Sequence, residues 1–261
     1  MAEHHEVYRQ AYYYDVIFKR DVSRELDFMT ALYEEIAGQA LRSILDNACG
    51  PGYHARGFAQ REVRAAGLDL RAEMIDYARL EAQQEGVEVD WIVGDMRDFR
   101  LTQPVDMAFT VFDGMDCMMT NEEIIAHFRA VAANLSPKGL YLIDLSHPRD
   151  CSLGRYMDFR YSGERDGVRV AIEWGTNQPA YHPVTQIADT QVTMRVHDRG
   201  QDHVFVSQAR ERFISAQEIV LLAACSNVFE ARAWYGDYDQ RQALDNSPAS
   251  RRMIAILQKI N

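Results

Sequence analysis

Residues 44–55, ILDNACGPGYHA, decide the fold of this chain. Two apolar residues lead into a carboxylate, Asp46, and small residues with two glycines follow before a helix-like continuation. A short apolar run that ends in turn residues is typical of a β-strand. The stretch therefore predicts a strand, a glycine-rich loop and the start of a helix. Loops of this kind commonly bind phosphate, which makes a carboxylate at the mouth of the loop unexpected.

Strands and helices alternate on both sides of this stretch. Helical patterns occupy residues 8–40, 53–60, 71–85 and 121–134, and short apolar runs occupy 63–70, 87–95, 105–113 and 140–145. A helix from residue 215 and strands over 229–235 and 252–258 follow later in the chain. This alternation predicts an α/β fold with a doubly wound parallel sheet, in which ligands bind beyond the carboxyl ends of the strands.

The alternation stops between residues 155 and 213, where period-two runs are separated by turns. Asp166-Gly167 lies between two such runs and is a hairpin signal. We therefore expect a small antiparallel sheet inserted into the α/β domain. The predicted domains are residues 1–150 with 214–261, including N-terminal helices, and an insertion over 151–213. The insertion could cap a substrate site or form the interface of a homodimer.

The composition limits the kind of protein. The chain has 261 residues, 47% hydrophobic and 26% charged, with a formal net charge of −11. So acidic a chain repels phosphate backbones, which argues against a nucleic-acid partner. It contains no apolar run long enough to cross a membrane, and its first ten residues do not resemble a secretory signal. Its four cysteines are far apart, which predicts neither a disulfide framework nor a metal site, so a cytoplasmic protein is expected.

The glycine loop formally fits the dinucleotide pattern G-x-G-x-x-A at residues 50–55. However, Asp46 would oppose a pyrophosphate, and the loop has no lysine. A carboxylate suits a ligand with an ammonium or sulfonium, while the glycines allow close approach and the helix N-terminus favours a carboxylate. S-adenosylmethionine carries both kinds of charge and is the cofactor we expect. A nicotinamide-dependent dehydrogenase is the alternative.

Further candidate contacts follow at the ends of the next strands. Asp69 ends the second strand, where its two oxygens can accept hydrogen bonds from both ribose hydroxyls. Asp95 ends the third strand and can accept from an adenine amino group, while Met96 can pack on the ring. Phe112 and Asp113 end the fourth strand, where the methyl donor would lie.

On these residues the chain resembles the class I S-adenosylmethionine-dependent methyltransferases. The matching segments are LDNACGPG (45–52), GLDL (67–70) with Glu73-Met74, GDMRDF (94–99) and LSPKG (135–139). The resemblance implies a Rossmann-like seven-stranded sheet whose last strand is antiparallel. It implies a cofactor site made of Asp46, Asn47, Ala48, Gly50, Gly52, Asp69, Leu70, Met74, Asp95, Met96, Arg97 and Phe112. Arg20 could bind the cofactor carboxylate or form an ion pair with a helix.

A narrower resemblance concerns the substrate. GDMRDFRL (94–101), Tyr14-Asp15 and an antiparallel insertion after the fifth strand are similar to bacterial aminosugar N,N-dimethyltransferases. The chain departs from that group at FDGMDCMM (112–119), where serine and tyrosine are usual, and this segment borders the substrate pocket.

The expected activity is methyl transfer to a small-molecule acceptor, with an amine nitrogen preferred, by direct displacement. Such a reaction requires alignment of the reacting atoms and exclusion of water, and an amine must be presented as the neutral base. Asp113, Tyr14 and His147 are the candidate catalytic residues. An O-methyltransferase, a methyltransferase acting on protein, and a binding protein that keeps the cofactor without catalysis are the alternatives.

Overall fold

The computed structural model describes residues 6–151, 154, 156 and 158–260. The chain divides into two compact units. The seven-stranded unit comprises Asp21–Arg149 and Ile214–Asn261, and the four-stranded unit comprises Met1–Arg20 and Asp150–Phe213. Within the described residues, no helix is long and apolar enough to cross a lipid bilayer.

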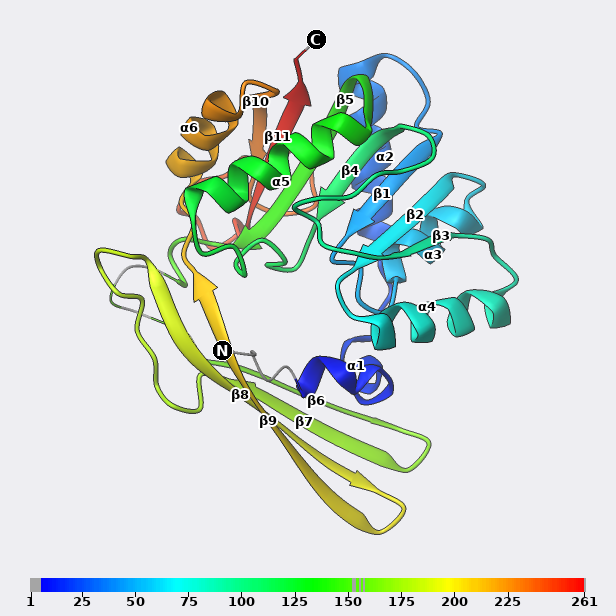
Figure 1. The fold of residues 1–261 in the computed structure, drawn as a ribbon, viewed down its shortest axis with the longest axis vertical. Helices are drawn as coiled ribbons and strands as arrows, with labels where there is room; N and C mark the ends of the chain where they lie inside the picture. Colours follow the sequence, from blue (N-terminus) through cyan, green and yellow to red (C-terminus); the bar gives the residue numbers. More distant parts are fainter. Residues whose placement is uncertain (1–5, 152–153, 155, 157, 261) are drawn as a thin grey trace. The chain divides into compact units, whose positions relative to one another are not determined.

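The seven-stranded unit is a sheet of order β10-β11-β5-β4-β1-β2-β3 (Figure 1). Its strands are β1 (Ser43–Asn47), β2 (Arg64–Asp69), β3 (Asp90–Val93), β4 (Val105–Thr110), β5 (Leu135–Ser146), β10 (Phe229–Tyr235) and β11 (Arg252–Lys259). Its helices are α2 (Ser23–Ala37), α3 (Tyr53–Gln60), α4 (Ala72–Glu85), α5 (Asn121–Asn134) and α6 (Ala216–Ser226). Strand β11 runs antiparallel to both β5 and β10, whereas the pairs formed by β1 to β5 are parallel. The structure thus confirms the predicted Rossmann-like sheet with an antiparallel last strand.

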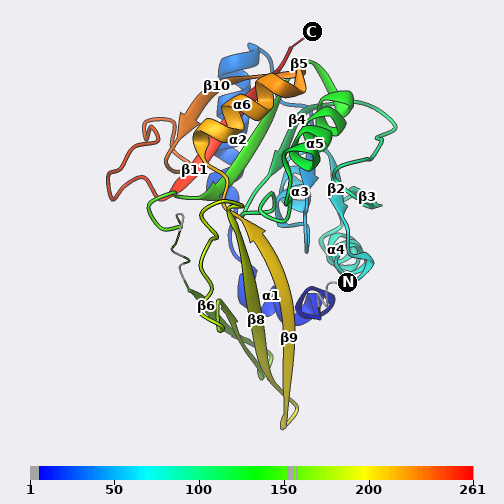
Figure 2. The ribbon, with the colours of Figure 1, turned by 60° about the vertical axis from the view of Figure 1, so that its left-hand side comes forward.

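Apolar side chains cover both faces of this sheet, as a doubly wound sheet requires. On one face, Phe128 of α5 and Leu222 of α6 belong to a buried cluster with Leu45 of β1. On the other, Leu26 of α2 and Phe58 of α3 pack with residues of β1, β4 and β5. Figure 2 shows α5 and α6 side by side. Because helices cover both faces of the sheet, the place for a ligand is at the carboxyl ends of the strands and in the loops that follow them.

The turn expected over residues 136–139 lies inside β5 rather than before it. Pairing between β4 and β5 shifts between Val105–Leu135 and Met107–Leu140, and Lys138 has φ 60°. The predicted turn residues are present, but sheet pairing continues on both sides of them as a bulge.

The four-stranded unit is an antiparallel sheet of order β6-β7-β8-β9. Its elements are the 3₁₀-helix η1 (Val7–Arg9), α1 (Ala11–Phe18), β6 (Phe159–Arg165), β7 (Val168–Trp174), β8 (Ile187–Asp198) and β9 (Gln201–Arg212). Strands β8 and β9 form a long hairpin, visible in both ribbon views (Figures 1 and 2). The structure therefore confirms the predicted antiparallel sheet.

Helix α1 belongs to the four-stranded unit, which differs from the boundary expected from the sequence. Buried Asp15 accepts a hydrogen bond from the Arg165 guanidinium of β6 at 2.6 Å. The ring of Phe18 packs edge-on against Tyr161 and Trp174. A Cβ on Gly163 would lie 2.4 Å from the Val16 carbonyl oxygen, so the missing side chain lets α1 approach the sheet.

Candidate functional site

The glycine loop follows β1 at the carboxyl edge of the seven-stranded sheet. Ala48, Gly50 and Gly52 have φ of 54°, 51° and 75°, and the Gly52 amide donates to the Cys49 carbonyl at 2.9 Å. Glycine tolerates this left-handed backbone without the Cβ penalty that Ala48 bears. The loop turns sharply into α3, which begins at Tyr53 as predicted.

Asp46 lies beneath the loop rather than on its surface. Its side chain is 1% exposed, and Oδ2 accepts a hydrogen bond from the Ala55 amide at 3.3 Å. Desolvation by burial raises the pKa of Asp46 to about 7, while His54 and the Ala55 amide lower it. The carboxylate therefore satisfies a free amide in the first turn of α3, which is the task of a helix cap. This geometry favours a loop-building role over the direct contact with a cation that was expected.

Asp69 at the end of β2 joins the two loops of the edge. Its Oδ2 accepts from the Gly50 amide at 2.8 Å, and its Oδ1 accepts from the Arg71 amide at 2.9 Å. Desolvation by burial raises its pKa, and the two amides oppose that shift. Each carboxylate oxygen has a second lone pair, so two further donors can be accepted. Next to it Leu70 is 57% exposed, whereas Met74 is buried in α4.

Asn47, the last residue of β1, is the unusual polar group of the edge. Its side chain is fully buried, yet neither its carboxamide nitrogen nor its oxygen has a partner within the described residues. It pairs in register with Thr110 at the end of β4. A buried amide without partners is unfavourable, and native structures almost always supply one. Asn47 therefore marks a place where a bound molecule could supply a donor and an acceptor.

The turn after β3 is tied to the sheet by a buried histidine that the sequence analysis did not select. The Met96 carbonyl accepts from Nδ1 of His127 at 2.8 Å, so Nε2 of the neutral ring accepts from the Tyr141 hydroxyl at 2.6 Å. Tyr141 in turn lies 2.7 Å from the Thr110 hydroxyl. Burial lowers the pKa of His127 to about 4, which keeps the ring neutral. This chain of hydrogen bonds links the Met96 backbone to Tyr141 of β5 and Thr110 of β4.

Asp95 and Arg97 form an ion pair on the outer side of the same turn. Arg97 donates from Nη2 to Oδ2 of Asp95 at 2.7 Å and also binds Glu123 of α5. Hydrogen bonds from Arg97 are the main cause that lowers the pKa of Asp95. Asp95 thus keeps its charge, but its oxygens already accept from the amide, Nε and Nη2 of Arg97, so its contact with a ligand amino group stays a prediction.

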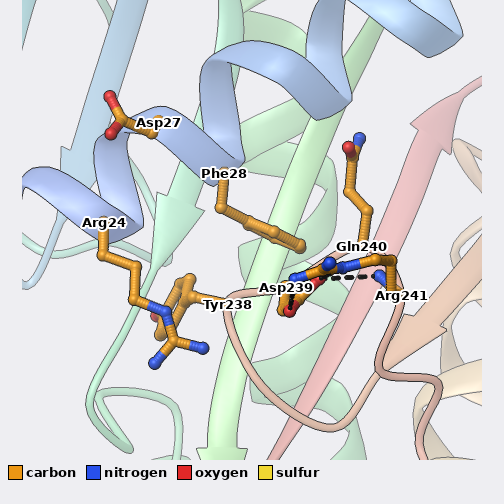
Figure 3. A pocket seen from close by; sticks show the side chains of 7 residues that line it. All are labelled: Arg24, Asp27, Phe28, Tyr238, Asp239, Gln240 and Arg241. Atoms are coloured by element: carbon orange, nitrogen blue, oxygen red, sulfur yellow. Dashed lines mark hydrogen bonds and ion pairs between the residues drawn. The ribbon is translucent and has the colours of Figure 1, made fainter.

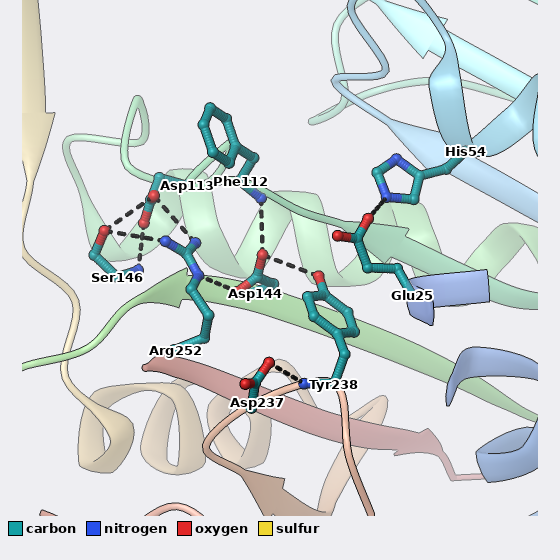
Figure 4. A network of polar contacts seen from close by, with 9 residues as sticks. All are labelled: Glu25, His54, Phe112, Asp113, Asp144, Ser146, Asp237, Tyr238 and Arg252. Atoms are coloured by element: carbon teal, nitrogen blue, oxygen red, sulfur yellow. Dashed lines mark hydrogen bonds and ion pairs between the residues drawn. The ribbon is translucent and has the colours of Figure 1, made fainter. Parts of the chain in front are cut away.

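The segment after β4 takes part in a network of polar contacts with β5, β11 and the loop after β10 (Figure 4). Phe112 and Asp113 have φ of 55° and 65°, which is unfavourable for residues with side chains. The Asp113 carboxylate accepts from the amide and the hydroxyl of Ser146 and, at 3.1 Å, from Nη2 of Arg252. Since three donors already occupy its oxygens, the geometry favours a positioning role for Asp113 over that of a proton acceptor.

Asp144 of β5 holds the other side of this network. Its Oδ2 accepts from the Phe112 amide at 3.1 Å and from the Tyr238 hydroxyl at 3.0 Å, and its Oδ1 accepts from Nε of Arg252 at 2.6 Å. Sequence reasoning missed Asp144 and Arg252. A carboxylate inside the apolar run LYLIDL was the available signal, because a buried charge needs a partner.

The two remaining catalytic candidates have other surroundings. His147 is buried, with Nε2 donating to the Asp245 carbonyl at 2.8 Å and Nδ1 accepting from the Arg149 amide at 3.0 Å. Both ring nitrogens are used, which favours a structural role over that of a base. Tyr14 packs against Phe18 of its own unit, with ring centroids 4.4 Å apart. Arg20 ends the first of the two chain segments of that unit, and its role toward the cofactor stays a prediction.

A separate pocket of about 380 Å³ lies between α2 and the loop after β10 (Figure 3). Its lining residues are Arg24, Asp27, Phe28, Tyr238, Asp239, Gln240 and Arg241. Arg241 binds Asp239 at 2.8 Å within the pocket wall, and Arg24 lies 3.3 Å from Asp237 just outside it, so both arginines of the wall are paired with a carboxylate. Tyr238 belongs both to this wall and, through its hydroxyl, to the Asp144 network.

Comparison with known proteins shows what this fold and this loop are similar to. Residues 44–139 match the family model described as a methyltransferase domain. A solved S-adenosylmethionine-dependent methyltransferase from Clostridium acetobutylicum superposes with a TM-score of 0.77 at 18% identity, over 95% of this chain and 96% of that one. Residues 44–139 are thus similar to a methyltransferase domain, as the sequence motifs predicted, and the chain as a whole shares its fold with a solved S-adenosylmethionine-dependent methyltransferase.

Curated relatives include both nitrogen and oxygen methyltransferases. The dTDP-3-amino-3,4,6-trideoxy-alpha-D-glucopyranose N,N-dimethyltransferase of Streptomyces venezuelae is 32% identical over 102 residues, which are 39% of this chain and 41% of that relative. A ubiquinone biosynthesis O-methyltransferase of Xanthomonas euvesicatoria is 33% identical over 116 residues, 43% of this chain and 45% of that relative. The alignments thus span less than half of these relatives.

Proposed function

We propose that the protein transfers a methyl group from S-adenosylmethionine to the nitrogen of a small-molecule amine. The observation that carries the cofactor part is the carboxyl edge of β1 and β2, where Asp69 holds the Gly50 amide at 2.8 Å. Each Asp69 oxygen keeps one lone pair for a ribose hydroxyl. The space at the Cβ position of Gly50 contains no atom within 4 Å, so a ligand can approach the backbone there.

Other residues of the edge fit the same cofactor. The buried carboxamide of Asn47 lacks partners and offers a donor and an acceptor to a polar ligand. Leu70 and Phe112, 57% and 41% exposed, offer apolar surface at the ends of β2 and β4 for a flat ring. Asp95 supplies an acceptor for the amino group of an adenine. S-adenosylmethionine supplies a methyl group already activated on a sulfonium.

The amine part of the proposal rests on the state of the acidic and basic groups. In direct displacement the acceptor attacks the methyl carbon, a new bond forms as the carbon–sulfur bond breaks, and the acceptor then loses a proton. A neutral amine attacks without prior deprotonation, whereas a hydroxyl generally needs a base. At the ends of β4 and β5, Asp113, Asp144 and His147 are all engaged by other donors or acceptors. This arrangement supports an amine.

The test is a pair of acceptors that differ only at the reacting atom. Some curated relatives are named as N,N-dimethyltransferases of dTDP-amino sugars, so we would compare a dTDP-3-amino-3,6-dideoxyglucose with the same sugar nucleotide bearing a 3-hydroxyl, using methyl-labelled cofactor. Methylation of the amine alone supports the proposal. Methylation of the hydroxyl compound alone would favour the O-methyltransferase reading. Turnover of neither, together with tight binding of S-adenosylhomocysteine, would require a wider acceptor panel before a silent binding protein is concluded.

A further inference from the structure

One arginine from the last strand binds two carboxylates at the turn that follows β4. Arg252 begins β11 and is paired in register with Ser146 of β5. Its guanidinium donates from Nε to Asp144 at 2.6 Å and from Nη2 to Asp113 at 3.1 Å (Figure 4). A planar guanidinium can bind two carboxylates at once in a fixed geometry, which a lysine cannot do. The two carboxylates would repel each other without it.

The two carboxylates in turn fix the backbone of Phe112 and Asp113. Oδ2 of Asp144 accepts from the Phe112 amide, and the Asp144 carbonyl accepts from the Asp113 amide at 3.2 Å. Both residues have positive φ, a conformation that persists only where the surroundings enforce it. Phe112 presents a partly exposed ring beside the edge that holds Gly50 and Asp69.

We propose that Arg252 is a positioning residue for methyl transfer, which holds the Phe112–Asp113 turn in the conformation that the cofactor site requires. The inference rests on the proposed function of this edge. A merely structural role would require Arg252 only to balance the charge of Asp144. The two roles differ in where a substitution acts: positioning predicts a change confined to the turn and the ligand, and a structural role predicts a change across the sheet.

The variants are Arg252→Gln, Arg252→Lys and, as a matched control, Arg251→Gln. Arg251 is the neighbouring residue, its side chain is exposed, and its substitution changes the net charge equally. Amide hydrogen exchange over residues 108–116 reports the turn, and calorimetric titration with S-adenosylhomocysteine reports the ligand site. Thermal unfolding of each variant reports the fold as a whole.

For Arg252→Gln we expect exchange at Phe112 and Asp113 to accelerate at least tenfold, with unchanged exchange in β1, β2 and β4. The affinity for S-adenosylhomocysteine should fall about tenfold. Arg252→Lys should restore part of both properties, because lysine keeps the positive charge but does not hold both carboxylates in a fixed geometry. Arg251→Gln should match the wild type.

Wild-type affinity and wild-type exchange in Arg252→Gln would overturn the role of Arg252 alone. Accelerated exchange throughout the sheet, with the affinity lost in proportion to stability, would also overturn it. If Arg252→Gln does not fold, Arg252→Lys carries the same test with an expected loss of at least threefold, and wild-type behaviour would again refute the role. Failure of the wild type to bind S-adenosylhomocysteine would instead overturn the proposed function.

Discussion

Alanine substitutions at three glycines separate two physical reasons for glycine at this edge. Gly50 has φ 51° but no atom within 4 Å of its Cβ position. Gly67 of β2 has an ordinary φ, yet its Cβ would lie 2.4 Å from Cζ3 of Trp91. Gly52 combines both, with φ 75° and a Cβ position 2.3 Å from Cη2 of the same indole. Torsional and steric costs can therefore be measured one at a time.

The magnitudes follow from general costs. A residue with a Cβ in the left-handed region costs about 1–2 kcal/mol, which is the expected loss for Gly50→Ala. Overpacking costs about 1–3 kcal/mol, and the Trp91 ring packs against the core cluster that contains Phe58 and cannot withdraw freely. Gly67→Ala should lose this amount although alanine normally suits a strand better than glycine. Gly52→Ala should lose roughly 2–5 kcal/mol.

The assay is urea unfolding followed by far-ultraviolet circular dichroism, in the wild type and in a Trp91→Leu background. Removing the indole should relieve most of the cost of Gly67→Ala and only part of the cost of Gly52→Ala, while Gly50→Ala should cost the same in both. The reasoning is refuted if Gly67→Ala is as stable as the wild type. It is equally refuted if Trp91→Leu leaves the cost of Gly67→Ala unchanged.

Three further predictions concern ligand affinity, pH and helix capping. Asp69→Asn should weaken S-adenosylhomocysteine about 10- to 100-fold in calorimetry, since hydrogen bonds to a charged group contribute roughly 1.5–3 kcal/mol; the exposed Asp98→Asn should not, and equal affinities would contradict the ribose role. The pKa of Asp46, raised from 3.8 to about 7, makes stability fall as pH rises through this range, because the native state binds the extra proton. The pKa of His127, lowered from 6.5 to about 4, makes stability fall as pH drops through that range. The two effects oppose each other in the wild type, and each variant removes one of them. Asp46→Asn leaves the effect of His127, so urea unfolding should show stability rising from pH 4 to 6.5; His127→Gln leaves the effect of Asp46, so stability should fall from pH 4 to 7, each by at most about 1.4 kcal/mol per pH unit. Stability profiles parallel to that of the wild type would contradict both assignments. Thr120→Ala should destabilise by about 1 kcal/mol in the same assay, because it removes the N-cap of α5 and its capping box, and unchanged stability would show that the cap contributes nothing.

Local signals in the sequence were sufficient for most of the fold. The run before Asn47 is apolar because β1 is buried on both faces, and the glycines after it mark the turn into α3. The capping boxes that begin at Thr120 and Ser215 mark the residues at which α5 and α6 start. Period-two runs likewise identified the antiparallel sheet. Each of these features depends on neighbours within a few residues, which a single sequence displays directly.

Features that depend on distant pairs were not predictable in this way. Helix α1 joins the four-stranded unit because Asp15 meets Arg165 and Gly163 leaves room for the helix backbone. The binding of Arg252 to Asp144 depends on the antiparallel register of β11 against β5, which sets Arg252 opposite Ser146. A shift of one residue in that register would send the arginine to the other face of the sheet.

The structure also answers why a carboxylate stands at the mouth of a glycine loop. Asp46 is buried under the loop and caps α3, and Gly52 accommodates the indole of Trp91, so both residues are required by the fold whether or not a ligand binds. Gly50 and Asp69 differ, because the Cβ position of Gly50 is open and both Asp69 oxygens retain acceptor capacity. Asp46 and Gly52 therefore serve the fold, whereas Gly50 and Asp69 stay open to a ligand. A substitution at Gly50 or Asp69 should change the affinity for S-adenosylhomocysteine more than it changes stability. These two residues are the ones that point to a bound cofactor.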